Sequence, residues 1–317
     1  MSKISDITSG ALKTAENAAL ACYDWIGKGK EKLADAAAVD AMRNSLNQMA
    51  ISGTIVIGEG ERDEAPMLYI GEEVGTGGLE LDIALDPLEG TTICATANDN
   101  SLAVIAFAHR NHLLNAPDVY MDKITIGPNL PKDIIDLDNS PKTNLINLAQ
   151  AKKCDISDLT AMILDRPRHE ELIAKSREAG VRVKLISDGD IAAAIATTEP
   201  DKTGIDIYMG TGGAPEGVLA AAALKVSNSQ MMGRLIFGDN QRQIDRAKKM
   251  GINDLSKKYL IDEMAKGDTL FIASGVTNGS MLGGVVRNDN FHIVNSMIMD
   301  SSQKSIKIIN SKYLKNA

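Results

Sequence analysis

Predicted strands and helices alternate along the second half of the chain, and this alternation limits the fold more than any other feature. Apolar runs typical of strands lie at 160–164, 181–186 and 205–209, and helical patterns lie at 170–179, 190–196 and 215–226. Alternation of this kind is typical of helices packed in layers against a sheet. The sequence therefore predicts an α/β fold, with a three-layer α/β region in this half.

The first half of the chain carries helical patterns before its strands. Apolar residues recur at helical spacing over 6–26 and 33–49. Short apolar or alternating runs predict strands at 54–57, 79–85 and 101–108, and further strands between 269 and 309. A stretch rich in Gly and Pro, 127–143, indicates a long connection. We therefore divide the chain into an N-terminal α+β half, 1–140, and a C-terminal α/β half, 141–317, within one compact unit.

Composition limits the partners of this chain. Its 317 residues carry a net charge of -8 and only 3% aromatic residues, which argues against nucleic acid or an anionic membrane as partner. An anionic small substrate stays compatible, because a bound metal ion reverses the local field. The three cysteines form no CxxC pair, no apolar run of about 18 residues occurs, and the first residues lack an apolar signal segment. We expect a cytoplasmic protein with reduced thiols.

The most informative motif follows the predicted strand at 79–85. Asp86–Thr91, sequence DPLEGT, holds two carboxylates three residues apart in a predicted turn. Such a turn can direct both at one hard cation, which prefers oxygen ligands. Gly90 allows the backbone to approach a ligand closely, and Thr91 adds a hydroxyl. The motif therefore suits metal-assisted phosphoryl transfer to water.

Three other loops after predicted strands are rich in acids, glycines or both. They are 58–61 (GEGE), 188–190 (DGD) and 210–216 (GTGGAPE). Ligands of open α/β sheets bind at the carboxyl ends of strands, so we expect these loops and Asp35 to form one site. Each loop also has a purely structural interpretation. Asp-Gly pairs are common in turns, and 213–216 is a good helix start with Pro in its first turn.

Cationic and aromatic candidates complete the set. Arg166–His169, sequence RPRH, follows a strand and offers two guanidinium groups to a phosphate, although a solvated loop would look the same. Tyr120 reads equally as a binding hydroxyl or as a core aromatic. With only four histidines in the chain, we expect carboxylates rather than imidazoles to hold any metal.

These motifs resemble a known family. Asp86–Thr91 resembles the Asp-Pro-(Ile/Leu)-(Asp/Glu)-Gly-Thr signature of the lithium-sensitive, metal-dependent sugar and inositol phosphatases. Further segments are similar to the class II fructose-1,6-bisphosphatases: 34–39 (ADAAAV), 53–61 (GTIVIGEGE), 63–68 (DEAPML), 115–118 (NAPD), 187–190 (SDGD) and 212–217 (GGAPEG). The similarity runs from about residue 10 to the C-terminus.

The resemblance implies an activity, a fold and an assembly. The activity is metal-dependent hydrolysis of the 1-phosphate of fructose 1,6-bisphosphate to fructose 6-phosphate and phosphate, a step of gluconeogenesis, with Mn²⁺ or Mg²⁺. The fold is a layered α/β/α/β/α sandwich of the sugar phosphatase and inositol monophosphatase type. The assembly is a homo-oligomer, either a dimer or a tetramer.

The resemblance also implies roles for the residues at matching positions. The catalytic residues are Thr91, Asp35 and Glu59. The metal ligands are Asp35, Glu59, Asp86, Glu89 and Glu216. The substrate contacts are Glu89, Gly90, Thr91, Tyr120, Arg166, Pro167, Arg168, Asp188, Gly189, Asp190 and Gly213. On this assignment the N-terminal half binds metal and the C-terminal half binds substrate.

A mechanistic hypothesis joins the two lines of reasoning. Thr91 orients a water for in-line attack and passes its proton to a carboxylate, with Asp35 the first choice. Arg166 and Arg168 clamp the distal phosphate, and Asp188 and Asp190 accept hydrogen bonds from sugar hydroxyls. The alternatives are a related phosphomonoesterase acting on sedoheptulose bisphosphate or inositol phosphates, and a non-catalytic sugar-phosphate-binding regulator.

Overall fold

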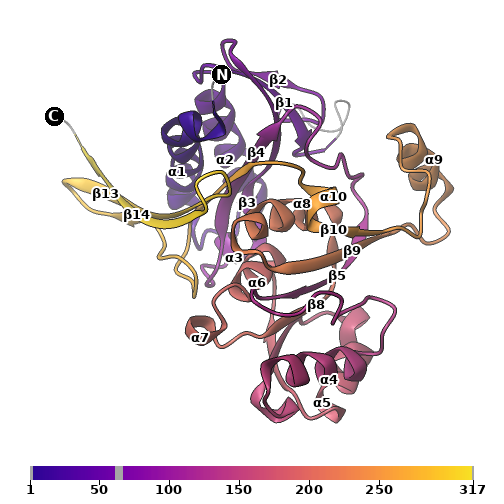
Figure 1. Cartoon of the computed structure of the whole chain (residues 1–317). Helices are drawn as coiled ribbons and strands as arrows, with labels where there is room; N and C mark the ends of the chain where they lie inside the picture. Colours follow the sequence, from indigo (N-terminus) through magenta and orange to yellow (C-terminus); the bar gives the residue numbers. More distant parts are fainter. Residues whose placement is uncertain (1–2, 61–66, 316–317) are drawn as a thin grey trace. The chain divides into compact units, whose positions relative to one another are not determined.

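The structure is a computed structural model that describes residues 3–60 and 67–315 (Figure 1). Glu61 of the predicted acidic loop, and 63–66 of the family-like segments, lie outside the described residues. The chain forms two compact units. Unit 1 is Met1–Leu114 together with Ala265–Ala317, and unit 2 is Asn115–Met264.

Unit 1 contains an eight-stranded mixed sheet. Its strands are β1 (Ile51–Ile57), β2 (Glu73–Val74), β3 (Leu79–Glu89), β4 (Leu102–His109), β11 (Thr269–Gly275), β12 (Val286–Arg287), β13 (Phe291–Asp300) and β14 (Ser305–Leu314). The order is β12-β13-β11-β4-β3-β1-β2, and β14 pairs with β13. Only β1 and β3 of the paired strands described here are parallel. Strand β4, which comes from the first half of the chain, pairs with β11, which lies beyond residue 264.

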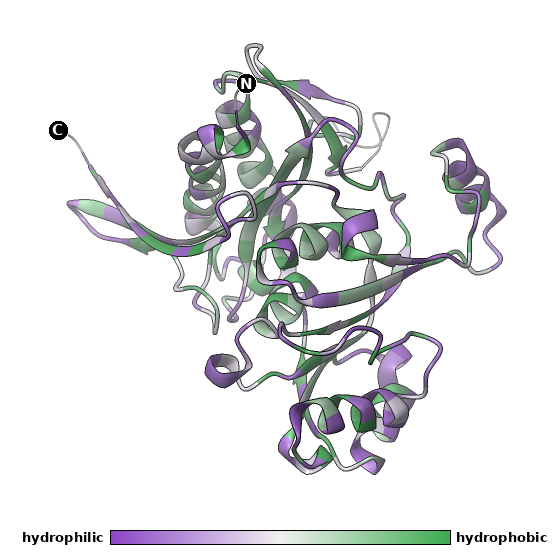
Figure 2. Ribbon diagram, viewed as in Figure 1, coloured by the Kyte–Doolittle hydropathy of each residue, from purple (hydrophilic) through white to green (hydrophobic). Residues whose placement is uncertain are grey.

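Strand β4 explains why this sheet has helices against it. All its residues from Leu102 to Ala108 are buried, as the apolar run at 101–108 predicted, and its ribbon is hydrophobic in Figure 2. A strand without a polar side must be covered on both faces. By contrast, β1 alternates buried and half-buried residues.

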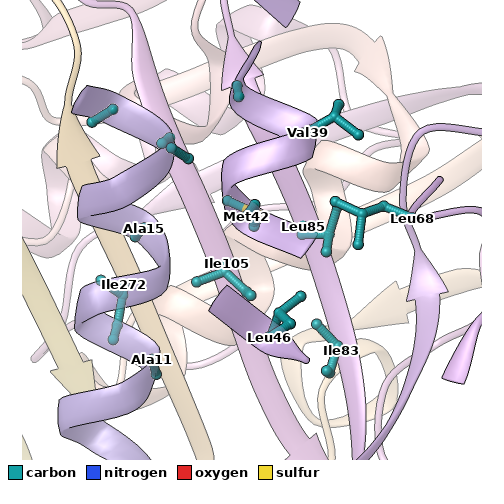
Figure 3. Close-up of a cluster of buried hydrophobic side chains, with 14 of the residues drawn as sticks. Ala11, Ala15, Val39, Met42, Leu46, Leu68, Ile83, Leu85, Ile105 and Ile272 are labelled. Atoms are coloured by element: carbon teal, nitrogen blue, oxygen red, sulfur yellow. The ribbon is translucent and has the colours of Figure 1, made fainter. Parts of the chain in front are cut away.

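Two long helices of unit 1 pack on this sheet. They are α1 (Thr8–Cys22) and α2 (Glu31–Leu46), accompanied by the short helices η1 (Ile4–Ile7), η2 (Tyr23–Trp25) and α3 (Thr91–Ala95). Ala11 and Ala15 of α1 and Met42 and Leu46 of α2 are fully buried in a cluster with Ile105 and other strand residues (Figure 3). Alanine on α1 lets the helix lie close to the strands, and each large buried side chain stabilises the fold by roughly 1.5–3 kcal/mol.

A polar contact ties the last strand of unit 1 to its first long helix. Glu16 of α1 is buried, and its carboxylate accepts a hydrogen bond from the Tyr313 hydroxyl of β14. The Ser296 hydroxyl of β13 also lies 3.3 Å from Oε1 of Glu16. A buried carboxylate is tolerated only where donors satisfy it, so these contacts fix the β13–β14 hairpin to α1.

Unit 2 contains a six-stranded mixed sheet. Its strands are β5 (Tyr120–Ile126), β6 (Thr160–Leu164), β7 (Arg182–Ile186), β8 (Ile207–Gly213), β9 (Gln230–Ile236) and β10 (Lys258–Leu260), in the order β10-β9-β5-β8-β6-β7. The pairs β6–β7 and β6–β8 are parallel, and the other pairs are antiparallel.

Helices of unit 2 follow the strands much as the alternation predicted. They are α4 (Pro141–Lys152), α5 (Glu170–Glu178), α6 (Asp190–Ala196), α7 (Pro200–Thr203), α8 (Ala214–Leu224), α9 (Gln241–Lys249) and α10 (Ile261–Met264), with short helices η3 (Ile156–Asp158), η4 (Pro167–His169) and η5 (Lys225–Ser227). Leu145 and Leu148 of α4 pack with Ile124 and Ile126 of β5 in the core. The Ala-rich α8 is almost entirely buried.

The predicted α/β class is confirmed, because each unit combines a mixed sheet with helices packed on it. Across residues 3–60 and 67–315, no helix is both long enough and apolar enough to cross a membrane.

Candidate functional site

The DPLEGT motif lies at a bulged strand end rather than in a simple turn. Strand β3 continues through Asp86 to Glu89, and its register against β4 shifts between these two residues. In a regular strand, residues three apart point to opposite faces, and a bulge breaks that alternation. The Leu88 N–H donates a 3.0 Å hydrogen bond to Oδ1 of Asp86, which holds the local bend.

Gly90 then turns the chain into helix α3. Its φ of 77° lies in the left-handed region, which is the conformation that glycine adopts without strain. Thr91 follows as the first residue of α3, so its hydroxyl lies directly after the two carboxylates. The Glu89 carbonyl accepts a 2.9 Å hydrogen bond from the Ser101 hydroxyl, which anchors this strand end.

Asp35 and Glu59 approach each other from different elements. Asp35 lies on α2, and burial raises its pKa. Glu59 follows β1, and its pKa is raised to about 8, first by burial and then by the negative charge of Asp35. A carboxylate whose pKa is raised by the charge of another lies close to it in a poorly solvated place.

Buried thiols lie beside these carboxylates. Burial raises the pKa of Cys22, and the charges of Cys94, Asp35 and Asp86 raise it further. Burial also raises the pKa of Cys94 to about 11. Thiols with raised pKa values stay protonated at neutral pH, and a protonated thiol is a poor metal ligand. The available donors of unit 1 are therefore carboxylate oxygens, which suit hard cations such as Mg²⁺ or Mn²⁺.

No three His, Cys, Asp or Glu side chains already form a metal-holding group within the described part of the chain. A divalent cation bound by neighbouring carboxylates relieves the repulsion that raises a carboxylate pKa. The raised pKa of Glu59 beside Asp35 is the matching observation. The carboxylates are therefore the type of ligand that a hard cation prefers, although the described residues do not already form a complete coordination site.

Glu216 is the predicted ligand in unit 2. It lies in the first turn of α8, after the N-cap Gly213 and Pro215, so the predicted helix start is confirmed. Its Oε2 is buried and has no hydrogen-bond partner among the described residues. Burial raises the pKa of Glu216 to about 7, the charge of Asp190 adds to this, and Lys123 opposes it. A buried acceptor without a donor fits a carboxylate that receives a cation.

A cavity of about 580 Å³ opens at Glu216. Its walls include Tyr120, Gly213 and Glu216, which are three of the predicted site residues, together with Asp118, Phe237 and Gln243. The side chain of Tyr120 is 52% exposed, so the core-aromatic interpretation of this residue is wrong. A volume of this size is typical of small-molecule sites.

Arg168 lies against Tyr120. Its guanidinium carbon is 4.8 Å from the centre of the Tyr120 ring, and its Nε donates a 2.9 Å hydrogen bond to the Thr211 carbonyl. These contacts hold a cationic group beside a wall residue of the cavity. Arg166 is the N-cap of η4, and its Nη1 lies 3.5 Å from the Asp165 carbonyl.

His169 fixes the turn that carries both arginines. Its Nδ1 lies 2.8 Å from the Leu164 carbonyl, and its Nε2 accepts a 2.8 Å hydrogen bond from the Thr211 N–H. The ring is buried, and Pro167 begins η4 beside it. Sequence reasoning assigned no role to His169. An isolated histidine after two arginines carries no pattern that distinguishes an anchor from a surface residue.

The DGD loop places its two acids differently. Gly189 has a φ of 91°, and Asp188 Oδ1 accepts a 3.0 Å hydrogen bond from the Gly189 N–H. Asp190 begins α6, is buried, and forms an ion pair with Lys123 of β5. Asp190 therefore lies near Gly213, which Lys123 also contacts, and near Glu216, whose pKa its charge raises.

Lys123 is the second residue that sequence reasoning missed. Its ammonium group donates to the Asp190 carboxylate and, at 2.7 Å, to the Gly213 carbonyl. In the structure Met121 and Thr125, two residues away on either side, are fully buried, which the sequence alone does not reveal. Alternation along β5 therefore places Lys123 on an inward face.

Comparison with known proteins gives the family. The model of the family described as bacterial fructose-1,6-bisphosphatase, glpX-encoded, matches residues 5–313. Fructose-1,6-bisphosphatase 1 class 2 of Escherichia coli (strain K12) is 45% identical, with 94% of this chain and 92% of that protein covered. A D-fructose 1,6-bisphosphatase class 2/sedoheptulose 1,7-bisphosphatase of Synechococcus sp. (strain JA-3-3Ab) is 40% identical, with 96% and 94% covered.

A solved structure of inositol monophosphatase from Anabaena (Nostoc) sp. PCC 7120 is 14% identical, with a TM-score of 0.33, and covers 62% of this chain and 73% of that chain. The family assignment comes from the sequence matches instead. They extend over nearly the whole chain and agree with the motif resemblance. The chain belongs to the bacterial, glpX-encoded class 2 fructose-1,6-bisphosphatases.

Proposed function

We propose that this chain hydrolyses the 1-phosphate of fructose 1,6-bisphosphate to fructose 6-phosphate and phosphate, as a metal-dependent phosphoric monoester hydrolase of gluconeogenesis. Family membership supports the reaction. The structural observation that carries the site assignment is the cavity of about 580 Å³, which is lined by Glu216, with its buried Oε2, and by Tyr120, against whose ring Arg168 lies. A sugar bisphosphate needs both kinds of group: a carboxylate that binds a metal cation and a guanidinium that binds a phosphate.

The proposed metal ligands are Asp35, Glu59, Asp86, Glu89 and Glu216, for Mn²⁺ or Mg²⁺. Support comes from the half-buried carboxylates with raised pKa values and from the protonated thiols of unit 1. When bound, such a cation polarises the phosphoryl group as a Lewis acid. The N-terminal half, 1–140, would supply most of these ligands, and the C-terminal half, 141–317, most of the substrate contacts.

Thr91 is the proposed orienting residue for the attacking water. Its hydroxyl accepts one proton of the water and passes its own proton to a carboxylate, for which Asp35 is the first choice and Glu59 the second. The water oxygen attacks phosphorus in line, and the bond from phosphorus to the sugar oxygen breaks. Glu89 and Gly90, adjacent to Thr91, border the same phosphate.

The remaining substrate residues recognise the sugar and its distal phosphate. Arg166 and Arg168 hold that phosphate on the turn shaped by Pro167, and Tyr120 stacks against Arg168. Asp188, Gly189 and Asp190 receive sugar hydroxyls. Gly213 caps the eleven-residue helix α8, whose N-terminal N–H groups favour anions.

We also propose that the protein is a cytoplasmic homo-oligomer, either a dimer or a tetramer. All three cysteines are free, as expected in a reducing compartment. The long strand β14 exposes Ile306, Ile308 and Leu314, which offers apolar area for a second copy. Light scattering coupled to gel filtration tests the assembly, and a monomeric mass at micromolar concentration would contradict it.

Phosphate release from a substrate panel tests the function. Purified protein is assayed with fructose 1,6-bisphosphate, sedoheptulose 1,7-bisphosphate and inositol 1-phosphate, each with Mn²⁺, Mg²⁺ or chelator. We expect release from fructose 1,6-bisphosphate that chelator abolishes. The sedoheptulose arm matters because relatives at 40% identity carry both activities in their names. Release from inositol 1-phosphate alone, or none from any substrate, would overturn the proposal.

A further inference from the structure

Lys123 is a buried cation in the middle of a strand. Its residue is 3% exposed, and the side chains of Lys123 and Asp190 are 2% and 8% exposed. Removing an ammonium group from water is costly, so a buried lysine is tolerated only where acceptors surround it. Here the acceptors are the Asp190 carboxylate and the Gly213 carbonyl, the latter at 2.7 Å.

These two acceptors belong to two predicted substrate-binding loops. Asp190 is the first residue of α6 and ends the DGD loop, and Gly213 is the last residue of β8 and the N-cap of α8. Lys123 itself lies on β5, which pairs with β8. One side chain thus joins three elements at the point where both loops begin their helices.

The glycines around Lys123 leave room for this arrangement. A Cβ atom added to Gly212 would lie 2.2 Å from Oδ2 of Asp190 and 3.0 Å from Nζ of Lys123. A Cβ atom added to Gly217 would lie 3.4 Å from Cδ of Lys123. Any side chain at Gly212 would therefore displace the ion pair, so the backbone is matched to it.

Stability alone is a weak reason to keep such a pair. Replacing a buried ion pair with apolar side chains of similar volume often leaves stability unchanged or raises it. The pair instead orients two groups. Lys123 holds Oδ2 of Asp190 and the carbonyl of Gly213, and Gly213 lines the cavity at Glu216. What is gained is the orientation of two groups that face a ligand.

We propose that Lys123 is a positioning residue for substrate binding, holding Asp190 and Gly213 in the orientation that the sugar phosphate requires. This inference rests on the proposed function. Lys123 does not touch the substrate; it acts through the carboxylate and the loop backbone. Its loss therefore weakens binding of the sugar phosphate more than it slows the chemical step.

The test compares Lys123→Met and Lys123→Arg with Lys152→Met. Lys152 forms a partly exposed ion pair with Asp206, also in unit 2, and that pair borders a different pocket. Measurements are kcat and KM for fructose 1,6-bisphosphate, calorimetric affinity for fructose 6-phosphate, and the thermal midpoint. We expect Lys123→Met to raise KM and weaken fructose 6-phosphate binding by about tenfold or more, with kcat within about threefold. Lys123→Arg should recover part of the affinity, and Lys152→Met should leave both constants unchanged.

Unchanged KM and product affinity in Lys123→Met would overturn the inference, as would an equal rise in KM for Lys152→Met. Should Lys123→Met not fold, the variant Lys123→Met with Asp190→Asn leaves no unpaired buried charge and is compared with Asp190→Asn alone. The double variant should have a higher KM than Asp190→Asn alone, because it also loses the hydrogen bond from Lys123 to the Gly213 carbonyl. Equal KM values for the two variants would count against the positioning role of Lys123. Wild-type activity is measured first, so a failure of the proposed function is distinguished from a failure of this inference.

Discussion

The Thr211 N–H donates a 2.8 Å hydrogen bond to Nε2 of His169. Because Nε2 accepts, the ring is neutral and its proton lies on Nδ1, facing the Leu164 carbonyl at 2.8 Å. Protonating Nε2 would set two N–H groups against each other. The turn that carries Arg166 and Arg168 is therefore anchored to β8 by the neutral form of one histidine.

Because His169 must be neutral to hold this turn, we expect the protein to lose stability against unfolding at acidic pH. Burial lowers the pKa of His169 below its ordinary value of 6.5, Arg168 and Arg166 lower it further, and the Leu164 carbonyl and Asp122 oppose them. The unfolded chain thus binds the proton more readily than the folded one. The stabilising contribution is complete above about pH 6.5 and falls as the pH drops from there toward the folded pKa.

We expect the thermal midpoint to fall less steeply between pH 7 and 5 in His169→Gln than in the wild type, since the variant lacks the imidazole that takes up a proton at this position. Calorimetry across that pH range measures both slopes. Identical slopes would exclude His169 as a source of acid sensitivity.

Thr91→Ala should lower kcat by roughly 10²–10⁴-fold, the usual range for losing a group that moves a proton in the transition state. Metal affinity should change little, because no carboxylate is removed. Thr92→Ala is the matched control, as Thr92 is the next residue of α3 and is exposed. A kcat for Thr91→Ala equal to that of Thr92→Ala would remove Thr91 from the mechanism.

Arg168→Ala should mainly raise KM, by roughly tenfold or more, since a hydrogen bond to a charged group contributes about 1.5–3 kcal/mol. The stacking contact with Tyr120 is lost as well. Arg177→Ala, an exposed arginine of α5, serves as the control and should leave KM unchanged. Steady-state kinetics at saturating metal decides this, and a KM within twofold of wild type would refute the clamp.

Tyr313→Phe should reduce the free energy of unfolding by about 1–3 kcal/mol, because the buried Glu16 carboxylate loses a donor. Tyr23→Phe in the same unit keeps its ring over Arg287, 5.2 Å from the guanidinium carbon, and should stay within about 0.5 kcal/mol of wild type. Urea unfolding of both variants measures the difference. Equal stabilities would mean that the tyrosine hydroxyl does not hold the hairpin.

The sequence revealed much of the local structure and less of the long-range contacts. The run at 160–164 became β6 without change, and Pro215 with Glu216 opened α8 as expected, because propensity and capping are local. The extent of β3 was missed: Pro87 and Gly90 suggested a turn, whereas pairing with β4 carries the strand through to Glu89.

Side-chain environments were harder to foresee than elements. Tyr120 stayed undecided from the residues alone because no strand was predicted over 120–126, and its 52% exposure depends on neighbours far along the chain. Lys123 and His169 escaped notice for the same reason. Their partners Asp190 and Thr211 are many residues away, and no local pattern encodes such pairs.

The pairing of β4 with β11 has a consequence for how the protein is made on the ribosome. Unit 2 is one continuous segment, so all of it is synthesised before the later strands of unit 1. Until then β4, buried almost along its whole length in the finished protein, can pair with β3 but lacks its β11 partner, so one of its apolar edges stays open. The nascent chain therefore has a period, lasting the synthesis of some 150 residues, in which this open strand edge can bind a wrong partner unless a chaperone covers it.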